Sequence, residues 1–386
     1  MKTEIGLEPP ERRIGQSAHD FVMGLGTRRL VMTRALRAGG APSVSSRFLQ
    51  RLLAVTGEDI AKAMRARGAS YLAYAGAVDD TPADSRQDFA ARPAPMPEAA
   101  RQPDRYTFSE VTRLRRDPYA VYARRVLRLD PLDPFNEDPG VIDRGNIYHA
   151  IVERFITSKM EPRGGGAEAA IIAIVHEVFS ERSLPAHVDA VWRSRAIEMA
   201  KRFLAWEAER RPFVAYSLVE TKAHLAVTEW LAVSGRADRI DIRSDGRADI
   251  IDYKTGASPS AKVARTLLDP QLALEAAVLK GGGFKGIEPR ETQDLLYARL
   301  RPGSRFAEDK VNNEHSKGDG VRSAMELAEE SMTQLIKLAG ALRENKAGFK
   351  SRVAPFKDGD HGGEYDHLAR VAEWSVAEAE GGEADE

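Results

Sequence analysis

The sequence of 386 residues contains no cysteine. Disulfides, thiolate zinc sites, cysteine-ligated iron–sulfur clusters and a cysteine nucleophile are therefore excluded, and the composition suits a reducing cytoplasm. There is also no run of about 18 apolar residues, and the first residues, MKTEIGLEPPERR, contain no apolar segment of the kind found in signal peptides. We therefore expect a cytoplasmic protein that neither crosses a membrane nor binds one.

The chain has no excess charge of either sign, because 57 Lys and Arg oppose 58 Asp and Glu. Any contact with nucleic acid must come from local basic patches. The sequence also lacks a G-x-x-x-x-G-K-[ST] loop, so no ATP site is predicted. The hydrophobic content of 42% is ordinary for a soluble globular protein, and the length allows two or three domains.

Composition divides the chain into four segments. Residues 1–75 are predicted to form a small, mostly helical piece, in which SRFLQRLLAV (46–55) has helical spacing. Residues 76–105 contain five prolines and few large apolar side chains, which predicts an extended or disordered linker. Residues 106–376 are the main domain, and the acidic residues 377–386 are predicted to be a disordered tail.

Apolar periodicity predicts the elements of the main domain. Helices are expected from about Ser109, over 141–158 and 190–210, from Asp269–Pro270 onward, and over 323–345. Strand-like patterns cover 217–231, 231–242, 247–256 and 293–300. This order predicts an α/β domain with a mixed sheet that is antiparallel at its centre.

Arginines are concentrated near the start of this domain, including Arg124 and Arg125 in YAVYARRVLRL (119–129). They form either a solvated basic helix face or a track for phosphates, with the tyrosines stacking on bases. Both interpretations stay open.

The segment IIDYKTG (250–256) places Asp252 and Lys254 on one face of a strand, roughly 7 Å apart. Alone, this pattern is explained by an ion pair at a strand end. A second acid, Asp238 in GRADRID (235–241), ends an apolar row formed with Ile240 and Ile242.

The turn Ser244-Asp245-Gly246 decides whether the two acids meet. A two-residue Asp-Gly loop would pair Asp238 with Tyr253 and separate the acids. A three-residue loop with Gly246 in the left-handed conformation would pair Asp238 with Asp252 on one face. We predict the three-residue loop if function needs both acids together.

Two facing carboxylates repel and have raised pKa values unless a cation lies between them. A hard divalent metal such as Mg²⁺ meets this need, because it prefers oxygen ligands. Lys254 would then stand beside the metal, where it can stabilise an anionic transition state or hold the attacking water. This grouping suits phosphodiester hydrolysis.

The sequence resembles the PD-(D/E)xK nuclease core in its RecB-like branch, because GRADRID is followed by IIDYKTG. Two further elements of that branch occur in the expected order, GNIYH (145–149) upstream and PQL (270–272) downstream. The resemblance implies a restriction-endonuclease-like fold, in which a mixed central sheet is flanked by helices. It implies His149, Asp238 and Asp252 as ligands of Mg²⁺ (or Mn²⁺), with the Tyr253 carbonyl assisting. Lys254 would be catalytic.

In the same resemblance, Gln271 would contact DNA or position the active-site lysine. His149 also admits a structural interpretation, since it flanks the apolar stripe of its helix. A structural role is preferred for Glu220. Arg236 either binds a DNA phosphate or pairs with an acid.

Segments 12–52 and 116–135 are similar to AddB proteins, the first to the end of their helicase-like portion and the second to the start of their nuclease domain. This resemblance implies a helicase-like remnant, a partner of the AddA helicase–nuclease type, and a role in processing double-strand DNA ends for recombinational repair. AddB proteins are much longer. Many carry an iron–sulfur cluster, which this cysteine-free chain cannot hold. Packing by Tyr365, Leu368 and Trp374 is expected to secure the C-terminal segment instead.

The leading prediction is therefore a metal-dependent deoxyribonuclease, acting as an exonuclease on linear ends and single strands. A non-catalytic DNA-binding or scaffold subunit and a stand-alone RecB-like nuclease are the alternatives.

Overall fold

The computed structural model describes residues 10–38, 41–80, 90–132, 138–256, 260–302, 306–313, 321–354 and 363–375. The chain divides into two compact units, 1–88 and 89–386. The predicted tail, 377–386, lies outside the described residues, as does the central part of the predicted linker. No helix among the described residues is both long enough and apolar enough to span a membrane.

Among its described residues, the first unit contains three helices, α1 (Pro10–Leu25), α2 (Arg47–Thr56) and α3 (Glu58–Asp79), and a hairpin of the short strands β1 (Arg37–Ala38) and β2 (Ala41–Pro42). The helix predicted over 46–55 is α2, and Ser46 caps it by accepting a hydrogen bond from the Phe48 N–H at 3.3 Å. Helix α3 continues into the segment where the sequence predicted the linker to begin.

The remaining described part of the predicted linker packs within the second unit. The Ser351 N–H donates to the Pro93 carbonyl at 3.1 Å, and the Phe349 N–H donates to the Pro95 carbonyl at 2.9 Å. Gln102 Nε2 donates to the Leu342 carbonyl at 2.9 Å. Apart from the 3₁₀ turn η3 (Ala99–Arg101), residues 90–104 contain no helix or strand, yet their backbone hydrogen-bonds to the chain that follows α11.

A six-stranded mixed sheet forms the centre of the second unit. Its strands are β3 (Arg105–Thr107), β4 (Val214–Thr228), β5 (Leu231–Arg243), β6 (Ala248–Lys254), β7 (Thr292–Arg299) and β8 (Ala307–Lys310). The order is β3-β5-β6-β7-β8, with β4 also paired to β5. Strands β4, β5 and β6 are antiparallel, as predicted for the centre of the sheet. Strand β7 is parallel to β6, which makes the sheet mixed.

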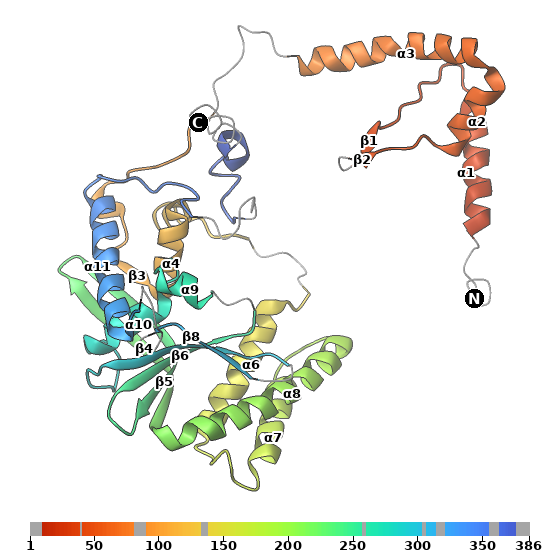
Figure 1. Cartoon of the computed structure of the whole chain (residues 1–386). Coiled ribbons are helices and arrows are strands. Elements are labelled where there is room, and N and C mark those ends of the chain that lie inside the picture. The colour runs from red at the N-terminus through yellow and green to blue at the C-terminus, as the bar shows by residue number, and fades with distance from the viewer. Residues whose placement is uncertain are drawn as a thin grey trace. The chain divides into compact units, whose positions relative to one another are not determined.

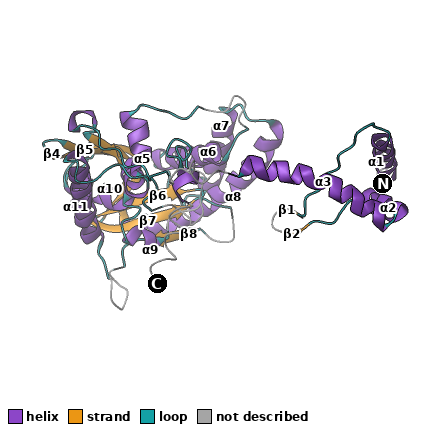
Figure 2. Ribbon diagram, turned by 90° about the horizontal axis from the view of Figure 1, so that it is seen from above, coloured by secondary structure: helices purple, strands orange, loops and turns teal. Residues whose placement is uncertain are grey.

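Helices cover both faces of this sheet (Figures 1 and 2). On one face lie α4 (Phe108–Arg116), α10 (Gln271–Lys280) and α11 (Ala324–Arg343), and on the other α6 (Val141–Thr157), α7 (Ala167–Ser180) and α8 (Ala186–Arg210). Along β6 the side chains alternate between the two cores, because Ile250 belongs to the first and Ile251 to the second. The α/β class is therefore confirmed.

Several elements were not predicted. Helix α7 is apolar on most of its surface, so its sequence shows little amphipathic contrast. The others are short: β3, β8, α5 (Pro118–Val121), the π-helical turn η4 (Tyr122–Val126), the 3₁₀ turn η5 (Arg211–Phe213) and α9 (Ala261–Arg265).

The glycine of GRADRID is explained by the start of α4. A Cβ at Gly235 would lie 2.3 Å from Cδ2 of Phe108, so the phenyl ring occupies the space a side chain would need. Thr107 caps α4 in a reciprocal capping box with Glu110. Ser109, where the helix was expected to begin, lies inside it instead, because the Thr107–Glu110 pair caps the helix two residues earlier and satisfies two backbone N–H groups at once.

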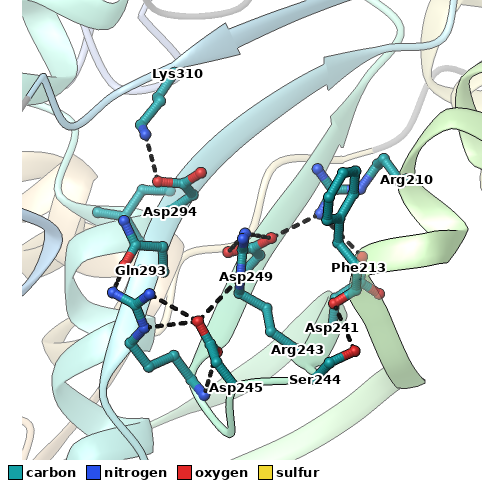
Figure 3. Close-up of polar contacts among 12 residues, drawn as sticks. Arg210, Phe213, Asp241, Arg243, Ser244, Asp245, Asp249, Gln293, Asp294 and Lys310 are labelled. Atoms are coloured by element: carbon teal, nitrogen blue, oxygen red, sulfur yellow. Dashed lines mark hydrogen bonds and ion pairs between the residues drawn. The ribbon is translucent and has the colours of Figure 1, made fainter. Parts of the chain in front are cut away.

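The β5–β6 hairpin has the predicted three-residue loop. The Arg243 N–H donates to the Arg247 carbonyl at 2.8 Å, and Gly246 between them has φ +87°. Ion pairs hold the hairpin just beyond this loop (Figure 3): Asp249 lies 3.1 Å from Arg243 Nη1 and 3.0 Å from Arg210 Nη2. Turn chemistry and charge pairing therefore select the same register.

The C-terminal segment packs on the start of the second unit, as expected for two of three residues. Tyr365 and Trp374 are buried against α5, whereas Leu368 is 37% exposed and contributes little. The Tyr365 hydroxyl donates to the Leu129 carbonyl at 2.6 Å, and Arg352 pairs with Asp366 at 2.6 Å. Aromatic packing and an ion pair thus secure this segment, in place of the iron–sulfur cluster of many AddB proteins.

Candidate active site and metal centre

Asp238 and Asp252 lie opposite each other on β5 and β6. The register pairs Arg239 with Ile251, so the next position along the ladder places the two acids face to face. Both point to the side of the sheet that carries Ile240 and Ile250. Asp238 Oδ2 accepts a hydrogen bond from the Tyr253 N–H at 2.9 Å. The register prediction is confirmed.

Lys254 and Gln271 hold the two oxygens of Asp252, which is 2% exposed. Lys254 Nζ lies 2.7 Å from Oδ2, and Gln271 Nε2 donates to Oδ1 at 2.7 Å. Gln271 is the first residue of α10, so the helix begins one residue later than predicted, with Pro270 as its N-cap. The Lys254 side chain is 28% exposed, so its ammonium group can reach a substrate.

His149 reaches the same strand end from the opposite helix layer. Its Nε2 lies 3.0 Å from the Tyr253 carbonyl oxygen, and its Nδ1 lies 3.6 Å from Asp238 Oδ2. Gly145, one helical turn earlier, explains the Gly-x-x-x-His spacing, because a Cβ there would come within 3.1 Å of Thr255 Oγ1. The glycine lets α6 approach the end of β6 closely.

Glu220 is a third acid at this site, one for which the sequence favoured a structural role. It lies on β4 between the pairs Val219–Arg239 and Thr221–Ala237, and therefore opposite Asp238. Its φ is +51°, a left-handed conformation that costs an ordinary residue roughly 1–2 kcal/mol. Single atoms of His149, Glu220 and Asp238 lie within 4.8 Å of one another, close enough to share a cation.

The electrostatics of this cluster favour a bound cation. Burial raises the pKa of Asp238 and of Glu220. Burial, with the charge of Asp238 adding to it and Lys254 opposing it, raises the pKa of Asp252 to about 6. Burial lowers the pKa of Lys254, but the charge and hydrogen bond of Asp252, together with the charges of Asp238 and Asp269, outweigh it and hold that pKa above its ordinary value. The lysine is therefore an ammonium ion at neutral pH.

The donor set fits a hard divalent cation such as Mg²⁺ or Mn²⁺. It consists of carboxylate oxygens, one imidazole nitrogen and the Tyr253 carbonyl oxygen. The structure brings His149, Asp238 and this carbonyl together directly, and it adds Glu220. Asp252 lies beside them, where Lys254 and Gln271 hold it.

The predicted DNA-binding arginines are engaged with acids. Arg125 Nη1 lies 2.7 Å from Glu110 Oε1, and Arg124 Nε lies 3.2 Å from Asp130. The Arg125–Glu110 pair is partly buried, which favours the structural interpretation for Arg125. Arg236 is 61% exposed and its Nε lies 2.5 Å from Glu220 Oε2, at the edge of the acid cluster. Contacts between these arginines and DNA stay predictions.

A sequence profile of the PD-(D/E)XK nuclease superfamily matches residues 105–362. The chain belongs to this superfamily. The match begins at β3 and extends beyond α11, so the domain typical of the superfamily lies within the second unit. Members of the superfamily are generally metal-dependent nucleases.

Curated relatives are uncharacterized proteins of Rickettsia. One from Rickettsia bellii is 28% identical over 185 residues, covering 47% of this chain and 22% of the relative. One from Rickettsia typhi is 29% identical over 204 residues, covering 50% and 23%. The chain therefore matches less than a quarter of their length. The crystal structure of SSO0001 aligns over 61% of this chain and 77% of its own, with 12% identity and a TM-score of 0.25.

Proposed function

We propose that the chain is a Mg²⁺-dependent deoxyribonuclease that hydrolyses phosphodiester bonds, acting as an exonuclease on linear ends and single strands. One observation carries the proposal: Asp238 and Asp252 face each other on adjacent strands, with Lys254 Nζ 2.7 Å from Asp252. The pair consists of the buried Asp252 and the half-buried Asp238. Such a pair with a partly exposed ammonium group beside it suits the stabilisation of a negatively charged phosphoryl centre.

His149, Asp238, Asp252 and the Tyr253 carbonyl would hold the metal ion, with Glu220 as a further oxygen donor. When bound, a divalent cation supplies positive charge to the phosphate and makes water a stronger nucleophile. Lys254 contributes its own positive charge from the open side of the site and stabilises charge that develops on the phosphate oxygens. Gln271 holds Asp252 through its Oδ1 and so keeps the other oxygen directed at Lys254.

We further propose that this nuclease is the strand-degrading part of an AddAB-type complex that processes double-strand DNA ends for recombinational repair. The support is the similarity of segments 12–52 and 116–135 to AddB proteins, together with the helical first unit. Its partner would be a helicase–nuclease subunit of the AddA type. Co-purification with such a subunit tests this part, and failure to bind would favour a stand-alone nuclease.

The test of activity is degradation of end-labelled linear single-stranded DNA by the purified chain with Mg²⁺. Asp252→Asn and Lys254→Met are compared with wild type, and Asp245→Asn in the exposed turn is the matched control. We expect each site variant to lose on the order of 10²–10³ in rate, the usual loss for a preorganised electrostatic group. The control should cut like wild type.

Equal cutting by all variants would show that the activity lies elsewhere. An inert wild type that still binds DNA, even with the partner subunit present, would favour the scaffold alternative. Closed circular single-stranded DNA, offered in parallel, distinguishes an exonuclease from an endonuclease, because only an endonuclease cuts it.

A further inference from the structure

Glu275 is a fully buried acid whose presence the metal site does not by itself explain. It lies on α10, is 0% exposed, and is surrounded on its helix by the buried side chains of Leu272, Leu274 and Leu279. Its Oε1 accepts a hydrogen bond from Gln271 Nε2 at 3.2 Å. Its Oε2 has no hydrogen-bond partner among the residues that the structure describes. A buried carboxyl with so few partners is costly.

Gln271 links this acid to the site. Its Nε2 carries two N–H donors, and the structure directs one to Asp252 Oδ1 at 2.7 Å and the other to Glu275 Oε1 at 3.2 Å. Rotating the amide by half a turn would bring the Gln271 carbonyl oxygen against two carboxyl oxygens. Glu275 therefore determines which end of the amide faces Asp252. The i, i+4 spacing of the two residues places them on one face of α10.

Burial and the nearby acids Asp252 and Asp238 raise the pKa of Glu275 well above its usual range, which favours the neutral form of its carboxyl. A neutral carboxyl can accept from Gln271 without adding a third negative charge beside Asp252. Stability alone would favour an apolar residue at this position, because a leucine of similar volume removes the unsatisfied oxygen.

We propose that Glu275 is a positioning residue, which acts through Gln271 to hold the carboxylate of Asp252 in the orientation that the metal site and Lys254 require. The proposal rests on the proposed function. Stability and metal binding should respond differently to this residue. Removal of the Glu275 carboxyl should leave the fold as stable as in wild type or more stable, yet weaken metal binding at the site.

The experiment uses the full chain and five forms: wild type, Glu275→Leu, Glu275→Gln, Gln271→Ala and the double variant Gln271→Ala/Glu275→Leu. Binding of Mn²⁺ alone is measured by titration calorimetry, cleavage of linear single-stranded DNA with Mg²⁺ gives kcat and KM, and thermal unfolding without metal gives Tm. Glu275→Gln is the conservative variant, because its amide oxygen can still accept from Gln271.

We expect Glu275→Leu to match or exceed the Tm of wild type while losing about 10-fold in Mn²⁺ affinity, the lower end of the range for outer-shell partners of metal ligands. Its kcat should fall with KM unchanged. Glu275→Gln should bind Mn²⁺ nearly as wild type does, because it keeps the hydrogen bond from Gln271. In the Gln271→Ala background, Glu275→Leu should add no further loss.

The proposal is overturned if Glu275→Leu binds Mn²⁺ like wild type, if its loss persists in the Gln271→Ala background, or if Gln271→Ala itself leaves Mn²⁺ affinity unchanged. Should Glu275→Leu melt well below wild type, Glu275→Met is judged by the same comparison, and a second low Tm assigns the residue a structural role. If wild type cuts no DNA, the proposed function fails, but the Mn²⁺ affinities still decide this inference.

Discussion

Replacement of Arg239 by methionine should destabilise the second unit strongly. Arg239 is 0% exposed, and its guanidinium lies 2.6 Å from Asp241 Oδ1 and 2.6 Å from Glu207 Oε2. It also donates to the Tyr253 hydroxyl at 3.1 Å. The side chain therefore neutralises two buried acids directly behind the strand that carries Asp252.

The loss should be about 3–5 kcal/mol at pH 7, the usual cost of removing one partner from a buried ion pair. Asp241 keeps a second partner, because Arg210 Nη2 lies 3.1 Å from its Oδ2. Glu207 is therefore the acid that loses most, and Glu207→Gln combined with Arg239→Met should recover part of the deficit. Lys280→Met, which breaks an exposed pair with Glu329, is the control and should cost less than about 1 kcal/mol.

The assay is equilibrium unfolding in guanidinium chloride followed by tryptophan fluorescence. All 4 tryptophans lie in the second unit, so the signal reports that unit alone. Trp206 is a local probe, since the Arg239 guanidinium carbon lies 5.6 Å from its ring centroid. The midpoint should shift to lower denaturant with an unchanged slope.

The deficit of Arg239→Met should also depend on pH. Burial raises the pKa of Asp241, but the charges of Arg239 and Arg210 outweigh it and hold that pKa below its ordinary value. Without Arg239 the folded-state pKa of Asp241 would rise, so the folded state would bind more protons as pH falls. The difference from wild type should therefore shrink between pH 7 and pH 5. A deficit under about 1 kcal/mol, or one that grows toward pH 5, would refute the reasoning.

Three further predictions concern the metal site. Mn²⁺ at about 100 times its Kd should stabilise wild type by about 2.7 kcal/mol, which raises Tm by roughly 4 °C for a unit of this size. In the same thermal melt, Asp238→Asn should show no shift in Tm. The Mn²⁺ affinity measured by calorimetry should fall from pH 7 to pH 5, because protons compete with the metal for two carboxylates. The pKa of Asp252 is about 6, and burial also raises the pKa of Asp238. A pH-independent affinity would contradict this. Gly145→Ala should weaken Mn²⁺ binding with little change in Tm. The new Cβ would meet Thr255 Oγ1 and push His149 away from the Tyr253 carbonyl. Unchanged binding would show that α6 can shift without cost.

The sequence by itself determined the fold class and reduced the meeting of the two acids to a choice between two loop lengths. Strand periodicity placed Asp238 and Asp252 on their strands, and Ser244-Asp245-Gly246 allowed either a two-residue loop or the three-residue loop that brings them opposite each other. Both signals are local, because alternation and turn chemistry depend on a few neighbouring residues. The glycine of the Gly-x-x-x-His segment was also visible as a motif, although its contact with Thr255 was not.

Only the tertiary structure decided which charged groups are paired and which are buried. Glu220 joins the acid cluster with its own backbone in a left-handed conformation inside strand β4. No sequence pattern predicts this conformation for a glutamate. Arg125 faces Glu110 and so is held by an acid, and Glu275 is buried under the acid pair. Such pairings arise between elements that are distant in sequence, as Glu207 on α8 and Arg239 on β5 show. The free energy that each ion pair contributes depends on how far packing excludes water from it, which the local sequence does not specify.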